Sequence, residues 1–245
     1  MPLETFKAQV ITITDLTHDV RQLDLRLLEP RAIKFKPGQF VSFDVRNEKT
    51  GRMVTRPYSL VSSPSRSDMI TLLFNLVPGG PGSTYLFSLK EGQEAEFKGP
   101  AGHFYLRDDP MRELLFVATG TGIAPIRSML LANLERPNPR PATLFWGLRS
   151  QRDLYYQEEL AELARREPKF TYFTTLSRPA PGWTGETGRV TRLVEERIAS
   201  VKHLAVYLCG NSGMIKDVTA IIQRKGLCPI HREKYYDDTG PEPED

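Results

Sequence analysis

The sequence predicts a mixed fold, with an antiparallel β-barrel in its N-terminal part and an α/β domain with a parallel sheet in its C-terminal part. Two patterns lead to this prediction: short β-rich stretches fill the first part, and strands alternate with helices in the second. The length of 245 residues is compatible with two domains of ordinary size. No apolar run approaches the roughly 20 residues that cross a bilayer, so we expect a soluble protein without a membrane partner.

The N-terminal part contains four stretches of strand character, several of them with alternating apolar residues. These stretches are residues 8–16, 20–28, 39–45 and 69–77. Turn-forming sequences such as KPGQ and NEKTG separate them. Because no helical stretch of comparable length lies between them, they predict an antiparallel barrel or sandwich. The stretch STYLFSL at 83–89 is an exception, since its apolar spacing predicts a short helix after a glycine-rich loop.

The character of the chain changes near residues 108–111. We therefore expect one domain over residues 1–107 and a second over residues 112–245 that ends in an acidic tail, TGPEPED, which we expect to be disordered. Each predicted strand of the second domain is followed by a predicted helix. The pairs are 114–120 with 126–134, 142–148 with 154–166, 170–176 with 190–198, and 203–210 with 214–225. Four such pairs predict a parallel sheet with helices on its faces.

Composition excludes several classes of protein. The net charge of +3 is small and the basic residues are scattered, which argues against nucleic acid as the main partner. The N-terminal sequence MPLETFKAQV lacks the apolar core of a secretory signal, so we expect a cytoplasmic location. Two cysteines are too few for an iron–sulfur cluster, and the four histidines lack metal-ligand spacing, so we expect no metal site.

The motif RPYS at 56–59 is the first candidate binding element. An arginine is suited to bidentate contact with a diphosphate. Strand alternation puts Arg56 and Tyr58 on one face and Ser59 on the other, although Pro57 makes a local irregularity plausible. Taken alone, the motif favours an ordinary strand with a surface arginine and a half-buried tyrosine. The next element, VPGGPGST at 77–84, shifts this interpretation, since free backbone N–H groups at a helix start attract phosphate.

The second domain carries candidate residues where its predicted strands end, because ligands of parallel sheets bind at the carboxyl ends of the strands. The segment FVATGTGIAP passes from a strand through a glycine turn into a helix, an arrangement that receives a dinucleotide diphosphate. Arg149, Ser177 and Arg178 follow the next two strands, and clustered arginines there suit a 2′-phosphate. Solvated surface arginines are the alternative. Cys209 ends the fourth strand, where a small thiol packs against a cofactor ring or is simply buried.

Taken together, these segments resemble the ferredoxin–NADP⁺ reductase family across almost the whole chain. Eight motifs occur in the order and spacing of the family. They are KPGQF, RPYS, the GxxS loop in GGPGST, GPAGHF, TGTGIAP, GLRSQRDLYYQEEL, LSR and YLCGNSGM. The resemblance implies an FAD-binding antiparallel barrel followed by an NADP(H)-binding α/β domain, with FAD as cofactor and NADP(H) as substrate.

The resemblance also implies roles for residues of the first domain. Arg56 would bind the FAD diphosphate, Tyr58 would stack against the isoalloxazine, and Ser59 would hydrogen-bond near flavin N5. The second diphosphate contact would come from the glycine loop. The remaining residues of these two motifs in the implied FAD site are Pro57, Gly80, Gly82 and either Ser83 or Thr84.

In the second domain, the resemblance implies a site for the nicotinamide nucleotide. It would be shaped by Thr119, Gly120, Thr121, Gly122 and Pro125, with Cys209 and Gly210 beside the nicotinamide. Members that select NADP carry a Ser-Arg pair that matches Ser177 and Arg178, and the bacterial branch adds arginines that match Arg149 and Arg189. NADPH is therefore expected as the preferred coenzyme.

The C-terminal end departs from the family. Members often end with an aromatic residue that covers the flavin, whereas here Tyr235 and Tyr236 are followed by the acidic tail. Tyr235 is kept as a candidate cofactor contact. Glu233 is only a loose match to the glutamate of a proton relay in plant-type members.

The resemblance implies an enzyme in which NADPH reduces the flavin and the flavin passes single electrons to a separate carrier, such as a ferredoxin or flavodoxin. Ser59 and Cys209 would position the reacting atoms. Lys49, Arg52 and Arg66 would attract an acidic carrier, unless they form a merely solvated face. The alternatives are a flavin reductase or oxygenase reductase component, and a redox-inert nucleotide-binding subunit.

Overall fold

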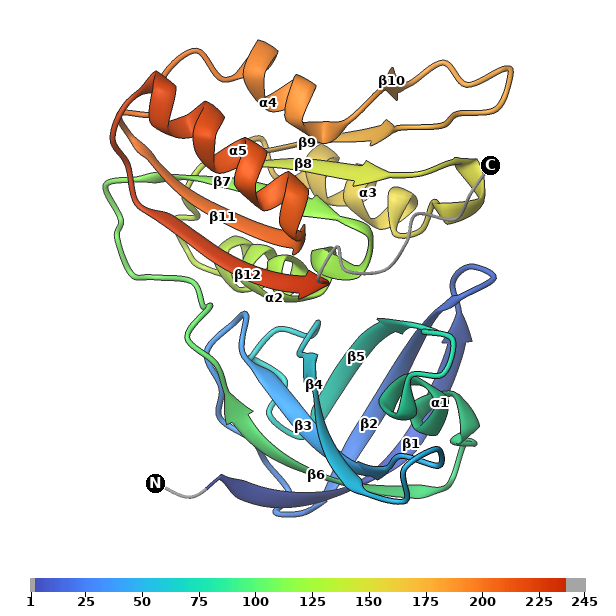
Figure 1. Ribbon diagram of the computed structural model, residues 1–245. Coiled ribbons are helices and arrows are strands. Elements are labelled where there is room, and N and C mark those ends of the chain that lie inside the picture. The colour runs from blue at the N-terminus through green and yellow to red at the C-terminus, as the bar shows by residue number, and fades with distance from the viewer. Residues whose placement is uncertain (1–2, 237–245) are drawn as a thin grey trace. The chain divides into compact units, whose positions relative to one another are not determined.

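The computed structural model describes residues 3–236, which form two compact units. The first unit comprises Met1–Leu106 with Arg127–Ala132, and the second comprises Arg107–Ile126 with Asn133–Asp245. The side chain of Tyr236 and the acidic tail expected to be disordered lie outside the described part of the chain. Each unit is built on one sheet, and the two sheets are of different types (Figure 1).

The first unit is an antiparallel sheet that curls on itself. The strands follow one another in space as β4-β3-β6-β1-β2-β5, and each neighbouring pair is antiparallel. A bridge between Leu60 and Leu72 brings the two ends of the sheet together, which confirms the predicted barrel. The strands are β1 (Glu4–Asp15), β2 (Val20–Glu29), β3 (Phe40–Arg46), β4 (Met53–Ser59), β5 (Met69–Asn75) and β6 (Glu94–Ala101).

Alternation of apolar and polar residues closes this barrel around its core. In β3, Val41, Phe43 and Val45 are buried, whereas Asp44 and Arg46 are exposed. One face of the strand is therefore inside and the other meets water. The helix α1 (Pro81–Ser88) buries Leu86 against this core and begins two residues earlier than predicted. Proline has no N–H to leave unbonded, which makes it well suited to the first helical position.

The second unit is a parallel sheet of six strands, in the order β10-β9-β8-β7-β11-β12. This confirms the predicted α/β class. The central strands are buried along nearly their whole length, as strands covered on both faces are. The short edge strand β10 and the edge strand β12 were not predicted. The strands are β7 (Glu113–Thr119), β8 (Ala142–Leu148), β9 (Phe170–Leu176), β10 (Glu186–Thr187), β11 (Leu204–Asn211) and β12 (Ile230–Tyr236).

Four α-helices cover this sheet, with α4 and α5 on one face and α2 and α3 on the other (Figure 1). α4 and α5 pack their apolar sides against Val117, Phe145 and Val206 of the sheet. Two short 3₁₀ turns, η1 (Gly120–Gly122) and η2 (Gln151–Asp153), follow β7 and β8. The α-helices are α2 (Ile123–Leu134), α3 (Gln157–Arg166), α4 (Val190–Arg197) and α5 (Ser212–Lys225).

The segment that begins the second unit is held by side chains of that unit. The buried Arg140 guanidinium donates to the carbonyl oxygens of Arg107, at 3.0 Å, and Asp109, at 2.8 Å. The Tyr207 hydroxyl accepts a hydrogen bond from the Arg107 N–H at 2.9 Å. Burial lowers the pKa of Arg140, although its guanidinium stays the donor in both contacts. The backbone around residue 107 is therefore fixed to the second unit.

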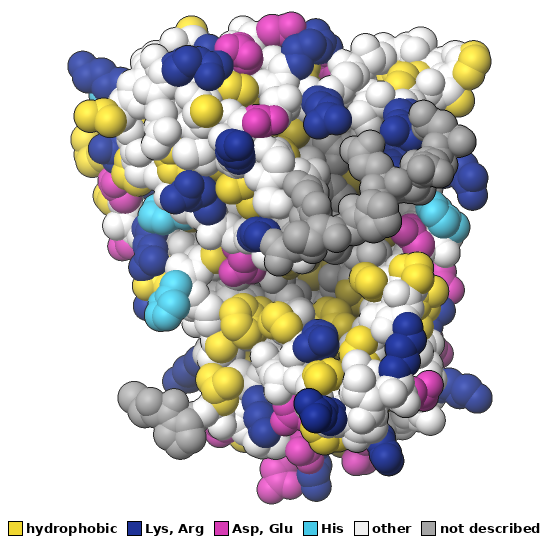
Figure 2. All heavy atoms as spheres, viewed as in Figure 1, with side chains coloured by type: hydrophobic (Ala, Val, Ile, Leu, Met, Phe, Trp, Pro, Cys, Tyr) yellow, Lys and Arg dark blue, Asp and Glu magenta, His cyan; other side chains and the backbone are white. Residues whose placement is uncertain are grey.

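The surface shows basic and acidic side chains interspersed on the visible face rather than gathered by sign (Figure 2). Among the described residues, no helix is long and apolar enough to cross a membrane. The part of the chain from residue 3 to residue 236 also contains no group of three or more acidic, histidine or cysteine side chains placed to hold a metal ion.

Candidate cofactor-binding sites

The motif RPYS lies on β4, at the edge of the first sheet, in register with β3. Phe40 pairs with Ser59, Val41 with Tyr58 and Phe43 with Arg56, without a bulge. The irregularity considered for Pro57 is absent from this pairing, because an edge strand tolerates the missing N–H of proline. Arg56 and Tyr58 therefore share one face of the strand, and the buried Ser59 lies on the other.

Helix α1 packs its first turn directly against that shared face. A Cβ built on Gly82 would lie 2.9 Å from both Cβ and Cγ of Arg56, and it would also collide with the Tyr58 hydroxyl. Only glycine allows this approach, since any side chain would push the helix away from the strand. The glycine loop at 77–84 and RPYS at 56–59, which are separate segments of the sequence, thereby come together.

Tyr58 is held in place by aromatic neighbours. Its ring meets Phe43 at a centroid distance of 5.9 Å and Phe74 at 5.6 Å, in both cases edge to face. Burial raises the pKa of Tyr58, while the nearby Arg56 cation acts in the opposite direction. The phenol is therefore protonated at neutral pH and offers a hydroxyl donor beside the helix start.

The start of α1 fits a phosphate group. Its N-cap residue, Gly80, has no side chain, and no side chain of the described residues caps the helix. The first turn therefore keeps backbone N–H groups without an intrahelical partner. Arg56 also lies here, since its Cβ and Cγ are beside Gly82, and its exposed guanidinium carries a positive charge and donates to the carbonyl of Thr55 at 2.9 Å. Two positive features next to each other suit the diphosphate of FAD.

Lys49 is an additional cation that the sequence motifs did not place here. A Cβ on Gly79 would lie 3.1 Å from the Lys49 Nζ, so the ammonium group lies beside the glycine loop. Lys49 belongs to the turn between β3 and β4. The antiparallel pairing of β3 and β4 would have indicated this position of Lys49, because it brings the turn between these strands toward the glycine loop.

The hydroxyl groups near these motifs have different environments. The buried Ser83 hydroxyl accepts from the N–H of Val77 at 3.0 Å and donates within the same loop to Val77 or Gly80, so it holds the loop together. Thr84 is exposed. Ser62 accepts from the Thr71 N–H, and Ser63 accepts from Ser65. Thr84 is therefore the better placed of the two alternatives for a ligand contact.

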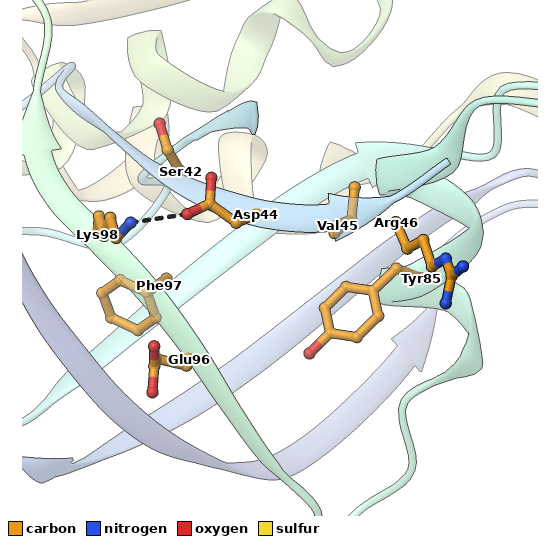
Figure 3. Close-up of a pocket in the computed structure, with 8 residues that line it drawn as sticks. All are labelled: Ser42, Asp44, Val45, Arg46, Tyr85, Glu96, Phe97 and Lys98. Atoms are coloured by element: carbon orange, nitrogen blue, oxygen red, sulfur yellow. Dashed lines mark hydrogen bonds and ion pairs between the residues drawn. The ribbon is translucent and has the colours of Figure 1, made fainter. Parts of the chain in front are cut away.

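A separate hollow of about 340 Å³ lies where β3 and β6 diverge, beside α1 (Figure 3). Two of its charged groups pair with each other, since Lys98 Nζ donates to Asp44 at 2.7 Å, and Thr55 donates to the same carboxylate. These contacts lower the pKa of Asp44, the hydrogen bond from Lys98 having the largest effect. None of the predicted site residues lines this hollow, and we place no cofactor in it.

In the second unit, the carboxyl ends of β7 and β11 meet at the predicted glycine turn. A Cβ on Gly122 would collide with the carbonyl of Cys209 and lie 2.9 Å from the Cα of Gly210. Gly210 has a φ of 145°, and a Cβ there would collide with the Thr119 hydroxyl. The Thr119 hydroxyl accepts from the Asn211 N–H at 3.1 Å. Two glycines and one hydroxyl thus join the two strand ends.

Gly120, at the first position of the turn, has open space around it. Its φ is 52°, and among the described residues no atom beyond its own chain neighbours lies within 4 Å of the position that a Cβ would take. A backbone that is exposed in this way, at the carboxyl end of a parallel strand and before a helix, fits the close approach of a dinucleotide. Thr121 and Pro125 are buried within the turn and α2, where they shape the backbone.

The predicted arginines lie along the same edge of this sheet. The Arg178 N–H donates to the Arg149 carbonyl at 2.7 Å, which joins the segments after β8 and β9. Arg189 directly precedes α4, and its neighbour Gly188 is bonded to the end of β9 through Thr175. Ser177, Arg178, Arg149 and Arg189 all have exposed side chains. By contrast, Arg192 is paired with Glu196 at 2.9 Å.

Cys209 is fully buried at the end of β11, opposite Glu233 of β12. Burial raises its pKa well above the ordinary value, and the charge of Glu233 acts in the same direction. Cys209 is therefore a neutral thiol at neutral pH and packs as a small apolar group. Tyr235 is half-buried on β12 beside an irregularity of the β11–β12 pairing. Its contact with a flavin stays a prediction, and the Tyr236 side chain lies outside the described residues.

We expect one thiol per chain to react with a disulfide reagent at about pH 8 in the native protein, and two after unfolding. Cys228 is half-buried and supplies the reactive thiol, at a reduced rate because burial raises its pKa, whereas Cys209 is shielded until the sheet opens. A titration of released thiolate before and after addition of denaturant measures both numbers. Rapid modification of both cysteines in the native protein would contradict the burial of Cys209.

Comparison with known protein families gives two matches that divide the chain as the two sheets do. Residues 7–105 match the oxidoreductase FAD-binding domain, and residues 116–220 match the oxidoreductase NAD-binding domain. The two matched ranges contain RPYS with the glycine loop and the TGTG turn with Cys209, respectively.

Characterised relatives and solved structures resemble almost the whole chain. Ferredoxin–NADP reductase B of Sorangium cellulosum is 33% identical, over 95% of this chain and 98% of that protein. The ferredoxin–NAD(P)⁺ reductase component of naphthalene 1,2-dioxygenase and salicylate 5-hydroxylase systems from a Ralstonia species is 32% identical, over 96% of this chain and 70% of its own length. The crystal structure of the Amycolatopsis cytochrome P450 reductase GcoB superposes with a TM-score of 0.85 at 29% identity, over 95% of this chain and 70% of that one.

Proposed function

The chain belongs to the ferredoxin–NADP⁺ reductase family of FAD- and NAD(P)-binding oxidoreductases, and from this premise we propose that it oxidises NADPH and passes single electrons to a separate carrier protein. FAD, when bound, accepts two electrons with a proton from a nicotinamide and releases the electrons one at a time, which no side chain can do. The task of the chain is to bind and orient the two nucleotides.

One observation carries the FAD part of the proposal: Gly82 brings the uncapped start of α1 against Arg56 and Tyr58. Arg56 and the first-turn N–H groups would hold the diphosphate, and Tyr58 would contact the ring system. Ser59 faces the opposite side of the strand and would bond to the ring edge. In the second unit, Gly120 and Gly210 would admit the nicotinamide nucleotide, and Cys209 would support it without taking or giving a proton.

The preference for NADPH rests on the arginine edge of the second sheet. Arg149, Arg178 and Arg189 project from segments that hydrogen bonds join, and their side chains are exposed. A 2′-phosphate carries about two negative charges, and guanidinium groups pair with it bidentately. The Ser177 hydroxyl, next to Arg178, would add a donor to the same phosphate.

A second candidate function is that of a reductase component in an oxygenase system. The names of two relatives favour it, because the Ralstonia protein serves a dioxygenase and a hydroxylase, and a protein of Mycolicibacterium smegmatis is the reductase component of propane 2-monooxygenase. The carrier would then be the oxygenase or its ferredoxin. The two candidates differ in the acceptor and share the nucleotide chemistry.

The proposal is tested on the purified full-length protein. We expect a yellow protein with the visible absorption bands of a flavin, which NADPH bleaches under anaerobic conditions faster than NADH does. Added ferredoxin or flavodoxin should then be reduced, whereas reduction of an oxygenase component alone would favour the second candidate. A colourless protein that takes up no FAD would instead support a redox-inert nucleotide-binding subunit.

We expect Arg178→Ala to lower kcat/KM for NADPH about tenfold and to leave kcat/KM for NADH nearly unchanged, since one charge-assisted contact to the 2′-phosphate is lost. Arg192→Ala is the matched control, because that arginine lies on the neighbouring helix and is already paired with Glu196. Steady-state kinetics with both coenzymes measure the ratio. Equal losses for NADPH and NADH would contradict a phosphate-selecting role of Arg178.

A further inference from the structure

A buried tryptophan of β8 reaches the glycine turn of the second unit. The Trp146 side chain is fully buried, and its indole N–H donates to the Gly120 carbonyl oxygen at 3.0 Å. The ring of Tyr155 contacts the indole edge to face, at a centroid distance of 4.8 Å. The indole is thus held by the sheet, by Tyr155 and by one hydrogen bond to the turn.

That hydrogen bond fixes a particular peptide plane. The Gly120 carbonyl also accepts from the Ile123 N–H. One of its two donors is therefore a backbone group of the turn, and the other is a side chain of β8. Because the peptide unit is planar and trans, the direction of the Gly120 carbonyl also determines the direction of the Thr121 N–H on the opposite side of the plane. Gly120 has a φ of 52°, a conformation with little steric restriction in glycine, so its peptide needs an external restraint.

We propose that Trp146 is a positioning residue for nicotinamide-nucleotide binding. It holds the Gly120–Thr121 peptide in the orientation that receives the ligand. This inference rests on the proposed function, since it assigns the ligand of the turn. Trp146 itself does not reach the open space beside Gly120. It acts from the buried side of the turn, and the nucleotide binds on the exposed side.

The alternative role for this tryptophan is packing alone, with the N–H bonded only because a buried donor needs a partner. The neighbouring Phe145 shows what packing requires in this strand. It is equally buried, faces α4 and α5 on the opposite side of the sheet, and stacks on Phe173 at 5.2 Å without any polar group. The two residues therefore form a matched pair for experiment, one with a hydrogen bond to the turn and one without.

The experiment removes the donor and keeps the ring. Site-specific replacement of Trp146 by β-(3-benzothienyl)alanine exchanges the indole N–H for sulfur with nearly the same shape, and Trp146→Phe provides a version made from ordinary amino acids. Phe145→Leu is the packing control. Each FAD-loaded full-length protein is compared with the wild type in three measurements: the Kd of NADP⁺ by calorimetry, KM and kcat for NADPH, and amide hydrogen exchange of residues 119–125 without nucleotide.

We expect both Trp146 variants to raise the Kd of NADP⁺ and KM about 3- to 10-fold, the equivalent of one hydrogen bond, with kcat nearly unchanged. Exchange in residues 119–125 should become faster in both. Phe145→Leu should lower the melting temperature without either effect. An unchanged Kd in the benzothienyl variant, or an equal rise in Phe145→Leu, would overturn the positioning role. The wild-type titration reports separately on the proposed function: absence of NADP⁺ binding there would refute the proposed function, and the inference with it.

Discussion

Arg56→Ala should yield a protein that is largely free of FAD after purification, with the Kd for added FAD raised about 100-fold. Arg56 lies next to the uncapped start of α1, and in the proposed site its guanidinium would form two charge-assisted hydrogen bonds to the diphosphate, together about 3 kcal/mol. The ratio of flavin to protein absorbance and a titration with FAD measure the loss. Because Arg56 is exposed, the melting temperature of the FAD-free protein should stay close to that of the wild-type apoprotein.

Arg52→Ala is the control for the loss of positive charge, because Arg52 is also exposed and lies just before the same strand. It should keep its FAD. If Arg56→Ala binds FAD as tightly as Arg52→Ala does, the diphosphate contact is assigned to the wrong residue. Lys49, which lies beside Gly79, would then be the next cation to replace.

Gly122→Ala should have the largest effect in the second unit. The added Cβ meets the backbone of Cys209 and Gly210, which cannot turn aside as a flexible side chain can. We expect a destabilisation of about 3 kcal/mol, together with a loss of NADPH binding as the ends of β7 and β11 separate. Denaturant unfolding measures the first effect, and calorimetric titration with NADP⁺ measures the second.

Gly120→Ala separates steric collision from backbone strain. Its Cβ would enter open space, so the variant suffers only the strain of a positive φ, about 1 kcal/mol. The cost in stability should therefore be clearly smaller than that of Gly122→Ala, although a Cβ on the exposed face of the turn would still hinder the nucleotide. Equal stability losses in the two variants would show that the strand ends yield more than the structure indicates.

The sequence predicts the features that depend on local pattern. Alternation within β4 predicts that Arg56 and Tyr58 share a face, and the structure has them there. Gly122 and Gly210 mark the turn where two strand ends approach. A Cβ at either position would collide with neighbouring atoms, which explains why no larger residue occupies these positions. The strand and helix order of the second unit follows from apolar periodicity in the same way.

Other features depend on tertiary context that no local pattern carries. From the sequence, the Ser83 hydroxyl could bind either a ligand or its own loop. In the structure it hydrogen-bonds to the backbone of Val77 and Gly80 in that loop. Strand β12 (IHREKYY) was not predicted because its position at the sheet edge permits charged residues that resemble a loop sequence. The contact of Trp146 with Gly120 joins strand β8 to the turn that follows β7, and only the folded sheet brings these residues within hydrogen-bonding distance.

The hydrogen bonds of Arg140 and Tyr207 with the start of the second unit have a consequence for sequence variation among homologues. Arg140 donates to the carbonyl oxygens of residues 107 and 109, and Tyr207 accepts from the N–H of residue 107, so these bonds use backbone atoms and exclude only proline at position 107. Across homologous sequences, the side chain at position 107 should therefore vary more than those at positions 140 and 207, where substitutions should be few and should occur together. The backbone conformation at this point would then be conserved even where the residue identity is not.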